Sequence, residues 1–233
     1  MSRTMPVEIW SDLICPWCWI GQRRFERALA EFAHRSQVRL VHRAFRLMPG
    51  ASPQPLETAM QHRFGRARFE AMHAEVKQAA EAEGLAYHLE DAEVGDTLDA
   101  HRLVLSAAGP GLQRAVVERL FRGYFSERAS LFERDTLLRL ATEAGLDRNG
   151  VVRVLDGAAH TQEAIVDQVR AKSLGAGGAP FFLVDGRVAV SGAQSPRQFL
   201  AALTQAWDLA GPGPDLEDDA AACGPDAFVA PSR

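Results

Sequence analysis

The chain has 233 residues, of which 47% are hydrophobic and 24% are charged, and its formal net charge is -4 at pH 7. This length and balance are those of a soluble globular protein with a substantial core, and they exclude disordered, collagen-like and coiled-coil classes. The small negative charge offers no broad attraction to nucleic acid or anionic lipid, so neither is an expected partner. No apolar run has the length of a signal peptide core or a membrane span, and we therefore expect a cytoplasmic protein.

The first 50 residues predict a strand, a helix and a second strand. Val7 to Trp10 has the composition of a short buried strand, and the alternation from Val38 to Ala44 predicts another. Between them, apolar residues at positions 25, 28, 29 and 32 recur at helical spacing, which predicts a helix from Cys15 or Pro16 to about His34. A strand, helix, strand unit suits a parallel pair of strands.

Residues 51–172 are predicted to form an all-helical insertion. Helical spacing dominates from Leu56 to about Lys172, and one buried face is clear in Val117, Leu120, Phe121 and Tyr124. The arginines at positions 23, 24 and 27 of the preceding segment are expected to form a solvated helix face rather than a binding patch.

Residues 173–210 predict a hairpin followed by a last helix. Two short apolar runs, Phe181–Val184 and Arg187–Val190, flank an Asp-Gly turn, which is the strongest local signal of a hairpin. The last helix is expected to bury Phe199, Ala202, Leu203 and Ala206. Residues 211–233 are rich in glycine, proline and acidic residues, and we expect a flexible tail there.

The segment Cys15-Pro16-Trp17-Cys18 carries the clearest chemistry. A cysteine at a helix N-terminus is stabilised as a thiolate by the helix dipole and the free backbone N–H groups, and Pro16 suits the first helical turn. Cys18 follows about one turn later, where it can attack a mixed disulfide formed at Cys15 and release the product. The spacing therefore predicts Cys15 as the nucleophile and Cys18 as the resolving thiol.

Half of a zinc site is the alternative for this pair, because zinc sites use the same spacing with two further Cys or His ligands. The third cysteine, Cys223, falls in the expected tail, and no histidine pair has ligand-like spacing near it. In a reducing compartment three cysteines do not form a structural disulfide framework. We therefore favour redox chemistry and expect no metal.

A second candidate element is Ala179-Pro180, directly before a buried strand. A proline inside a strand would remove a ladder hydrogen bond, so Pro180 is expected at the strand's start. If its peptide bond is cis, the backbone beside it is available for pairing with an extended substrate; an ordinary loop proline is the alternative.

Three further residues are candidates for tuning or binding. Asp12 lies three residues before Cys15, where it can tune the thiol or relay protons, with a solvated loop or capping role as the alternative. His101 can face the site from the helical insertion, or be a hydrogen-bonded structural histidine. Trp17 lies between the two cysteines and can contact substrate, whereas Trp19 is expected to pack in the core.

Three separated segments resemble the DsbA family of thioredoxin-like oxidoreductases, and within it the FrnE-like branch, often labelled as polyketide-biosynthesis dithiol-disulfide isomerases. They are Ser11–Gly21, Thr97–Leu103 and Gly178–Gln194. The resemblance implies an α/β thioredoxin-like fold interrupted by a helical domain, with Cys15 and Cys18 as redox thiols and Pro180 as a cis-proline.

The chain departs from that branch at two points. Members often end in a second pair of cysteines, whereas this chain has Cys223 alone, which we interpret as a remnant. Asp96 also stands where the branch usually has asparagine before Thr97.

Three functions remain to be compared. The first is a thiol-disulfide oxidoreductase or isomerase that acts on protein or small-molecule thiols, with no tightly bound cofactor. The second, similar to 2-hydroxychromene-2-carboxylate isomerase and kappa-class glutathione transferases, uses glutathione as co-substrate and would survive loss of Cys18. The third is a non-catalytic binding or chaperone module that is indifferent to Cys15. A homodimer is compatible with each of them.

Overall fold

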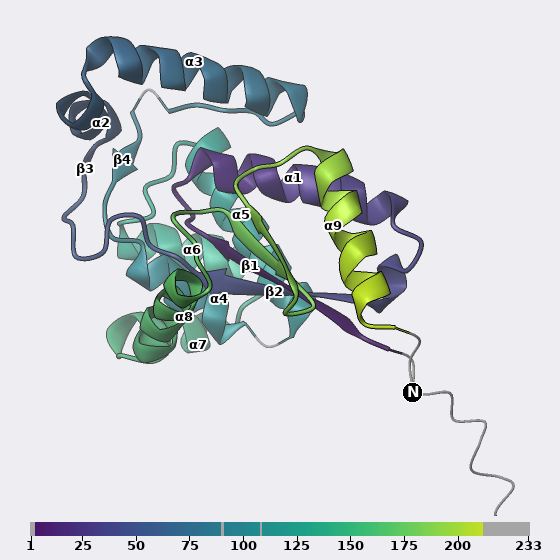
Figure 1. Ribbon diagram of the computed structural model, residues 1–233. Coiled ribbons are helices and arrows are strands. Elements are labelled where there is room, and N and C mark those ends of the chain that lie inside the picture. Colours follow the sequence, from purple (N-terminus) through teal and green to yellow (C-terminus); the bar gives the residue numbers. More distant parts are fainter. Residues whose placement is uncertain (1–2, 90, 108, 212–233) are drawn as a thin grey trace, which may run out of the picture.

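A computed structural model describes residues 3–89, 91–107 and 109–211 of the chain. Its centre is a four-stranded sheet in the order β2-β1-β5-β6 (Figure 1). The parallel pair is β1 and β2, and the pairs β1–β5 and β5–β6 are antiparallel. These strands are β1 (Met5–Ser11), β2 (Val38–Ala44), β5 (Phe181–Val184) and β6 (Val188–Ser191). The expected tail lies outside the described residues from position 212 onward, and Cys223 with it.

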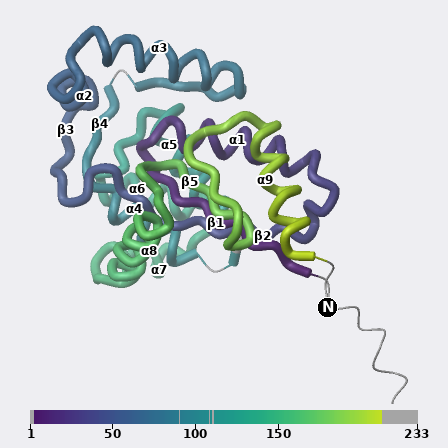
Figure 2. Tube along the Cα trace, viewed as in Figure 1, coloured from purple at the N-terminus to yellow at the C-terminus, as the bar shows by residue number. Residues whose placement is uncertain are grey.

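Helices cover both faces of the sheet, as the ribbon and the tube show (Figures 1 and 2). One face carries α1 (Pro16–Glu31) and α9 (Pro196–Leu209), and the other carries α4 (Leu98–Ser106), α5 (Pro110–Ser126) and α8 (Thr161–Ser173). The remaining elements are η1 (Arg35–Gln37), β3 (Gln54–Pro55), α2 (Leu56–Phe64), α3 (Arg66–Ala82), β4 (Glu93–Val94), α6 (Arg134–Glu143) and α7 (Arg148–Asp156). No helix of the described residues is long and apolar enough to cross a bilayer.

The pleat of β5 divides its side chains between two cores. Phe182 and Val184 belong to the core under α1 and α9, whereas Phe181 and Leu183 belong to the core under α8. The ring of Phe182 stacks on Phe25 at 5.5 Å between centroids. Because both faces of β5 are buried, all four of its residues are apolar and the strand shows no alternation of polar and apolar residues.

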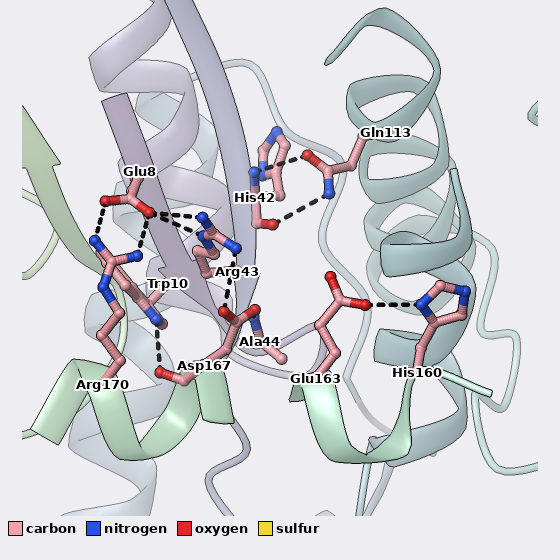
Figure 3. A network of polar contacts seen from close by, with 10 residues as sticks. All are labelled: Glu8, Trp10, His42, Arg43, Ala44, Gln113, His160, Glu163, Asp167 and Arg170. Carbon is pink, nitrogen blue, oxygen red and sulfur yellow. Dashed lines mark hydrogen bonds and ion pairs between the residues drawn. The ribbon is translucent and has the colours of Figure 1, made fainter. Parts of the chain in front are cut away.

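Polar contacts fix α8 to the sheet (Figure 3). The Asp167 carboxylate accepts hydrogen bonds from the Ala44 amide at 3.0 Å and from Arg43 at 3.3 Å. Arg170 donates to Glu8 at 2.6 Å, and Glu8 also pairs with Arg43. Because buried carboxylates need such partners, this network holds α8 in one orientation beside the end of β2.

The expected strands and the helix that follows the cysteines are confirmed, with one difference at the helix end. The helix ends at Glu31 rather than near His34. Phe32 already has extended backbone angles, yet its side chain is buried and packs edge-on against Trp207. The apolar periodicity therefore continues past the last helical residue.

The helical insertion between β2 and β5 is confirmed, and it contains one feature that the pattern does not show. Gln54–Pro55 and Glu93–Val94 pair as a two-residue antiparallel ladder, which is too short to produce a periodicity. The ladder joins the two ends of the chain segment that contains α2 and α3.

We expected the three arginines of α1 to form a solvated helix face, and this expectation is wrong for two of them. Arg23 pairs with Glu118 of α5, and Arg24 donates to Glu83 at 2.9 Å, just beyond α3. Only Arg27 of the three is largely exposed. The insertion packs against α1 and brings these acidic residues with it, which the local sequence does not indicate.

Candidate active site

The cysteine pair lies where β1 ends and α1 begins. Cys15 is the N-cap residue of α1 with extended backbone angles, and Pro16 follows in the first turn. The Cys18 amide donates to the Cys15 carbonyl at 3.0 Å, which sets the two thiols one turn apart. Both thiols are free, and the residues are only 5% and 2% exposed.

The two sulfur atoms have different surroundings. The Cys15 thiol donates to the Ala179 carbonyl at 3.7 Å, whereas the Cys18 sulfur accepts the Asp12 amide N–H at 3.4 Å. Burial, the hydrogen bond with Cys15 and the charge of Cys15 raise the pKa of the Cys18 thiol well above its usual value. Cys15 lines a large cavity, and Cys18 does not. A ligand in that cavity therefore meets Cys15 first.

The Ala179–Pro180 peptide bond is cis, and Pro180 is buried directly before β5. Its ring packs against the first turns of α1, because a side chain at Gly21 would come within 3.1 Å of Pro180 Cγ and within 3.3 Å of Ala193 Cα. Glycine at position 21 thus permits the close approach of α1 to this loop. The geometry brings Pro180 and the cysteine pair together, as expected.

Asp12 lies beneath the pair with no exposed surface, so the solvated loop alternative is wrong. Its carboxylate accepts the Thr97 hydroxyl at 2.8 Å and the Leu47 amide at 2.6 Å. Burial raises the pKa of Asp12 to about 6, and these hydrogen bonds oppose the rise. Asp12 is therefore a buried acid that can change protonation near neutral pH.

His101 enters the site from α4 and faces Asp12. Its Nε2 lies 3.9 Å from Asp12 Oδ1 and has no hydrogen-bond partner within the described residues. Burial and the charge of Arg46 lower the pKa of His101 to about 4, so the ring is neutral at physiological pH. A hydrogen bond with the Phe45 backbone engages the ring, so His101 has one partnered nitrogen, as a structural histidine would, and one nitrogen that faces Asp12 without a partner among the described residues.

The two tryptophans have separate roles. Trp17 is half-buried and lines the cavity beside Cys15. Trp19 is buried and stacks on Phe125 at 5.6 Å between ring centroids, as expected for a core residue.

Three residues join the site that the sequence did not single out for a role. The Leu47 amide and the Thr97 hydroxyl hold Asp12, and Tyr87 lines the cavity. Thr97 stands at the start of a motif, which was the one available signal for it. Among residues 3–89, 91–107 and 109–211, no group of three or more His, Cys, Asp or Glu side chains could hold a metal ion.

Several solved structures of other proteins have a fold similar to that of this chain. A probable DsbA oxidoreductase from Streptomyces coelicolor is 42% identical, with a TM-score of 0.83 over 98% of this chain and 100% of that chain. The cytosolic disulfide reductase DsbM from Pseudomonas aeruginosa, solved with GSH, is 22% identical with a TM-score of 0.62 over 86% of this chain and 98% of its own. A 2-hydroxychromene-2-carboxylate isomerase is 13% identical with a TM-score of 0.67 over 88% of this chain and 97% of its own.

The last two similarities are low in identity and support the fold alone. A search of curated proteins finds no match. A family profile, that of the DSBA-like thioredoxin domain, matches residues 6–204. Together with the 42% identity to the Streptomyces protein, this match shows that the chain belongs to the DSBA-like thioredoxin domain family.

Proposed function

We propose that this protein is a thiol-disulfide oxidoreductase that acts through Cys15 and Cys18. The observation that carries the proposal is the asymmetry of the pair: Cys15 lines the cavity at the start of α1, and Cys18 lies outside its lining with a raised pKa. An attacking thiolate must be accessible, whereas a resolving thiol is best kept protonated until the mixed disulfide forms.

The reaction has two balanced steps. The Cys15 thiolate attacks one sulfur of a substrate disulfide, so a mixed disulfide forms and one substrate thiolate leaves. Cys18 then loses its proton and attacks the Cys15 sulfur, which releases the second substrate thiolate and leaves a Cys15–Cys18 disulfide. The substrate gains two electrons and the protein loses two. The reverse sequence oxidises a dithiol.

We assign Asp12 as the acceptor of the Cys18 proton. Its ionised form contributes to raising the pKa of Cys18, so the two groups interact electrostatically. Burial disfavours the charged carboxylate and raises the pKa of Asp12 to about 6, so proton transfer from Cys18 to Asp12 costs less than transfer to an exposed carboxylate would. The Thr97 hydroxyl and the Leu47 amide position the carboxylate beneath the pair, and His101 lies beside it.

The test is an equilibrium titration against glutathione, with thiol trapping and mass spectrometry. We expect a reversible two-electron transition confined to Cys15 and Cys18, and a glutathione mixed disulfide at Cys15 that accumulates in Cys18→Ser. Cys223→Ser is the matched control and should titrate like the wild type. If no disulfide forms between Cys15 and Cys18, the oxidoreductase proposal fails.

Assignment to the FrnE-like branch and the use of glutathione as co-substrate belong to the same proposal and rest on the sequence motifs. A cytoplasmic location also belongs to it and rests on the hydropathy of the sequence. The glutathione-dependent isomerase predicts a different result in the same experiment. Absence of a Cys15–Cys18 disulfide in the titration, together with glutathione-dependent isomerisation that is undiminished in Cys18→Ser in a separate assay, would favour the isomerase over disulfide exchange.

A further inference from the structure

A cavity of about 500 Å³ lies against Cys15. Its inner wall is formed by Ile14, Cys15 and Trp17, at the start of α1. Its outer wall is formed by α2 and α3, which stand away from the sheet and are joined to the rest of the fold through the β3–β4 ladder (Figure 1). This volume is in the range of pockets that enclose small ligands.

The outer wall is predominantly apolar. Met60 and Phe64 come from α2, and Phe69 and Met72 come from α3. Met72 is 38% exposed, on a helix that also contributes Val76 and Ala80 to the core. Methionine and phenylalanine together give an adaptable surface for an apolar body.

The charged residues of the lining have one sign. They are Arg46, Arg63 and Lys172, and none of the lining residues is acidic. Arg46 pairs with Asp96. Arg63 is exposed and lies over the Phe64 ring at 5.2 Å, and no ion pair with a described residue engages it or Lys172. The cavity is thus electropositive in a protein whose net charge is negative.

Three residues of the lining each have a buried hydrogen-bonding atom that lacks a partner within the described residues. Two are donors, the Tyr87 hydroxyl and Arg46 Nε, and one is an acceptor, Gln168 Oε1. Tyr87 is 8% exposed, and its pKa is raised by burial and by the charges of Tyr124 and Cys15. Its hydroxyl therefore stays protonated and lies within electrostatic reach of the Cys15 sulfur. Unpaired buried donors are costly unless a ligand accepts from them.

We propose that this cavity binds a small-molecule disulfide or thiol that has an apolar body and an anionic group, with Arg63 and Lys172 facing the anion and Tyr87 donating a hydrogen bond close to the reacting sulfur. The proposal rests on the function proposed above and names its substrate class. The bound disulfide reacts with Cys15 by the two balanced steps already given, so no further reactant is needed in a single turnover.

The first experiment compares two aromatic disulfides of different charge on the reduced protein. The probes are dithiobis(nitrobenzoate), which has two carboxylates, and dithiodipyridine, which is uncharged. We expect Arg63→Ala/Lys172→Ala to slow the reaction with the dianion about fivefold to tenfold, since each exposed cation contributes up to about 1 kcal/mol. The reaction with dithiodipyridine should change less than about twofold. Arg148→Ala, an exposed arginine at the start of α7, is the control and should change neither rate.

The second experiment measures binding without chemistry. The Cys15→Ser protein cannot exchange disulfides, so calorimetric titration with naphthalenesulfonate tests the cavity alone. We expect saturable binding that weakens in Cys15→Ser/Arg63→Ala/Lys172→Ala and in Cys15→Ser/Tyr87→Phe.

The outcomes separate the two proposals. Absence of reaction of Cys15 with either disulfide would overturn the oxidoreductase, and binding of naphthalenesulfonate would still support the cavity. Equal slowing of both disulfides in the double variant, or no slowing of either, would overturn the anionic substrate class. The reaction of the aromatic disulfides with Cys15 could also be slowed by an uncharged apolar peptide disulfide and not by naphthalenesulfonate. That result would overturn the small-molecule class and assign the cavity to protein substrates.

Discussion

The two walls of the cavity beside Cys15 are built differently. On the sheet side, Asp12 and Cys18 are almost fully buried beneath Cys15, and seven residues of α1 are buried. On the opposite side, α2 has no buried residue, and α3 buries only Val76 and Ala80. The aligned sulfur pair lies on the densely packed wall, and the weakly packed wall faces it across the cavity.

The comparison predicts how stability is distributed. Segments with few buried apolar contacts open at lower free energy than the core, and ligand-covering elements belong to that class. Substitutions in α2 and α3 should therefore change binding more than global stability, and substitutions around the sheet should do the reverse.

The largest expected effect comes from a matched pair of phenylalanines. Phe182 is fully buried in the sheet between Phe25 and Phe199, and Phe69 is half-buried in α3. Phe182→Ala should lower the free energy of unfolding by about 3 to 5 kcal/mol, because it leaves a cavity in a close-packed core. Phe69→Ala should lower it by about 1 kcal/mol. Urea unfolding measures both, and equal losses would remove the distinction between the walls.

The next effect depends on pH. Burial raises the pKa of Asp12 from 3.8 to about 6, so this group's contribution to stability is fully present below pH 3.8 and is lost as pH rises through about 6. A shift of about two pKa units corresponds to about 3 kcal/mol. The free energy of unfolding of Asp12→Asn relative to the wild type should therefore rise by up to about 3 kcal/mol between pH 3.8 and about pH 7.

Two buried histidines change the stability with the opposite pH dependence over the same pH range. Burial lowers the pKa of His42 and of His101 from 6.5 to about 4, so their contributions are present above 6.5 and are lost as pH falls through about 4. Only the difference between the wild type and Asp12→Asn isolates the carboxyl group. Urea unfolding across this pH range measures it, and a difference that does not change with pH would contradict a raised pKa of Asp12.

A smaller effect tests what holds the outer wall. Glu83, just beyond α3, accepts from Arg24 at 2.9 Å and from Arg27 at 3.0 Å, and its side chain is 6% exposed. Glu83→Gln should lower the opening free energy of α3 by about 2 kcal/mol, measured by amide hydrogen exchange, with little change in β1. Glu70→Gln removes an exposed pair with Arg66 and should cost less than about 0.5 kcal/mol. Faster exchange throughout the sheet in Glu83→Gln would show that α3 does not open separately.

Features that depend on neighbouring residues could be predicted from the sequence. The spacing of Cys15 and Cys18, the strand that follows Pro180 and the core face of α9 all follow from local periodicity. The positions of these elements in the thioredoxin-like fold could then be predicted from the three segments that resemble the DsbA family.

Contacts between distant segments could not be predicted in this way. Asp12 is held by Leu47 and Thr97, which lie 35 and 85 residues away in the chain. The residues of α2 and α3 that line the cavity have the same apolar character as core residues, so their spacing predicts a helix but not an open face. Tyr87 lies in a segment without periodicity, and nothing in its surroundings indicates an unpaired hydroxyl.

The smallest expected effect distinguishes the unpaired Tyr87 hydroxyl from the hydrogen-bonded Tyr124 hydroxyl. Tyr124 donates to the Glu93 carbonyl at 2.6 Å, whereas the Tyr87 hydroxyl has no partner among the described residues. Tyr124→Phe should lower the free energy of unfolding by about 1 kcal/mol, and Tyr87→Phe should leave it unchanged or raise it, because removal of an unpaired buried donor removes its desolvation cost. Urea unfolding of the two variants measures the difference. A loss in Tyr87→Phe as large as in Tyr124→Phe would mean that the Tyr87 hydroxyl is bonded within the protein and is not kept for a ligand.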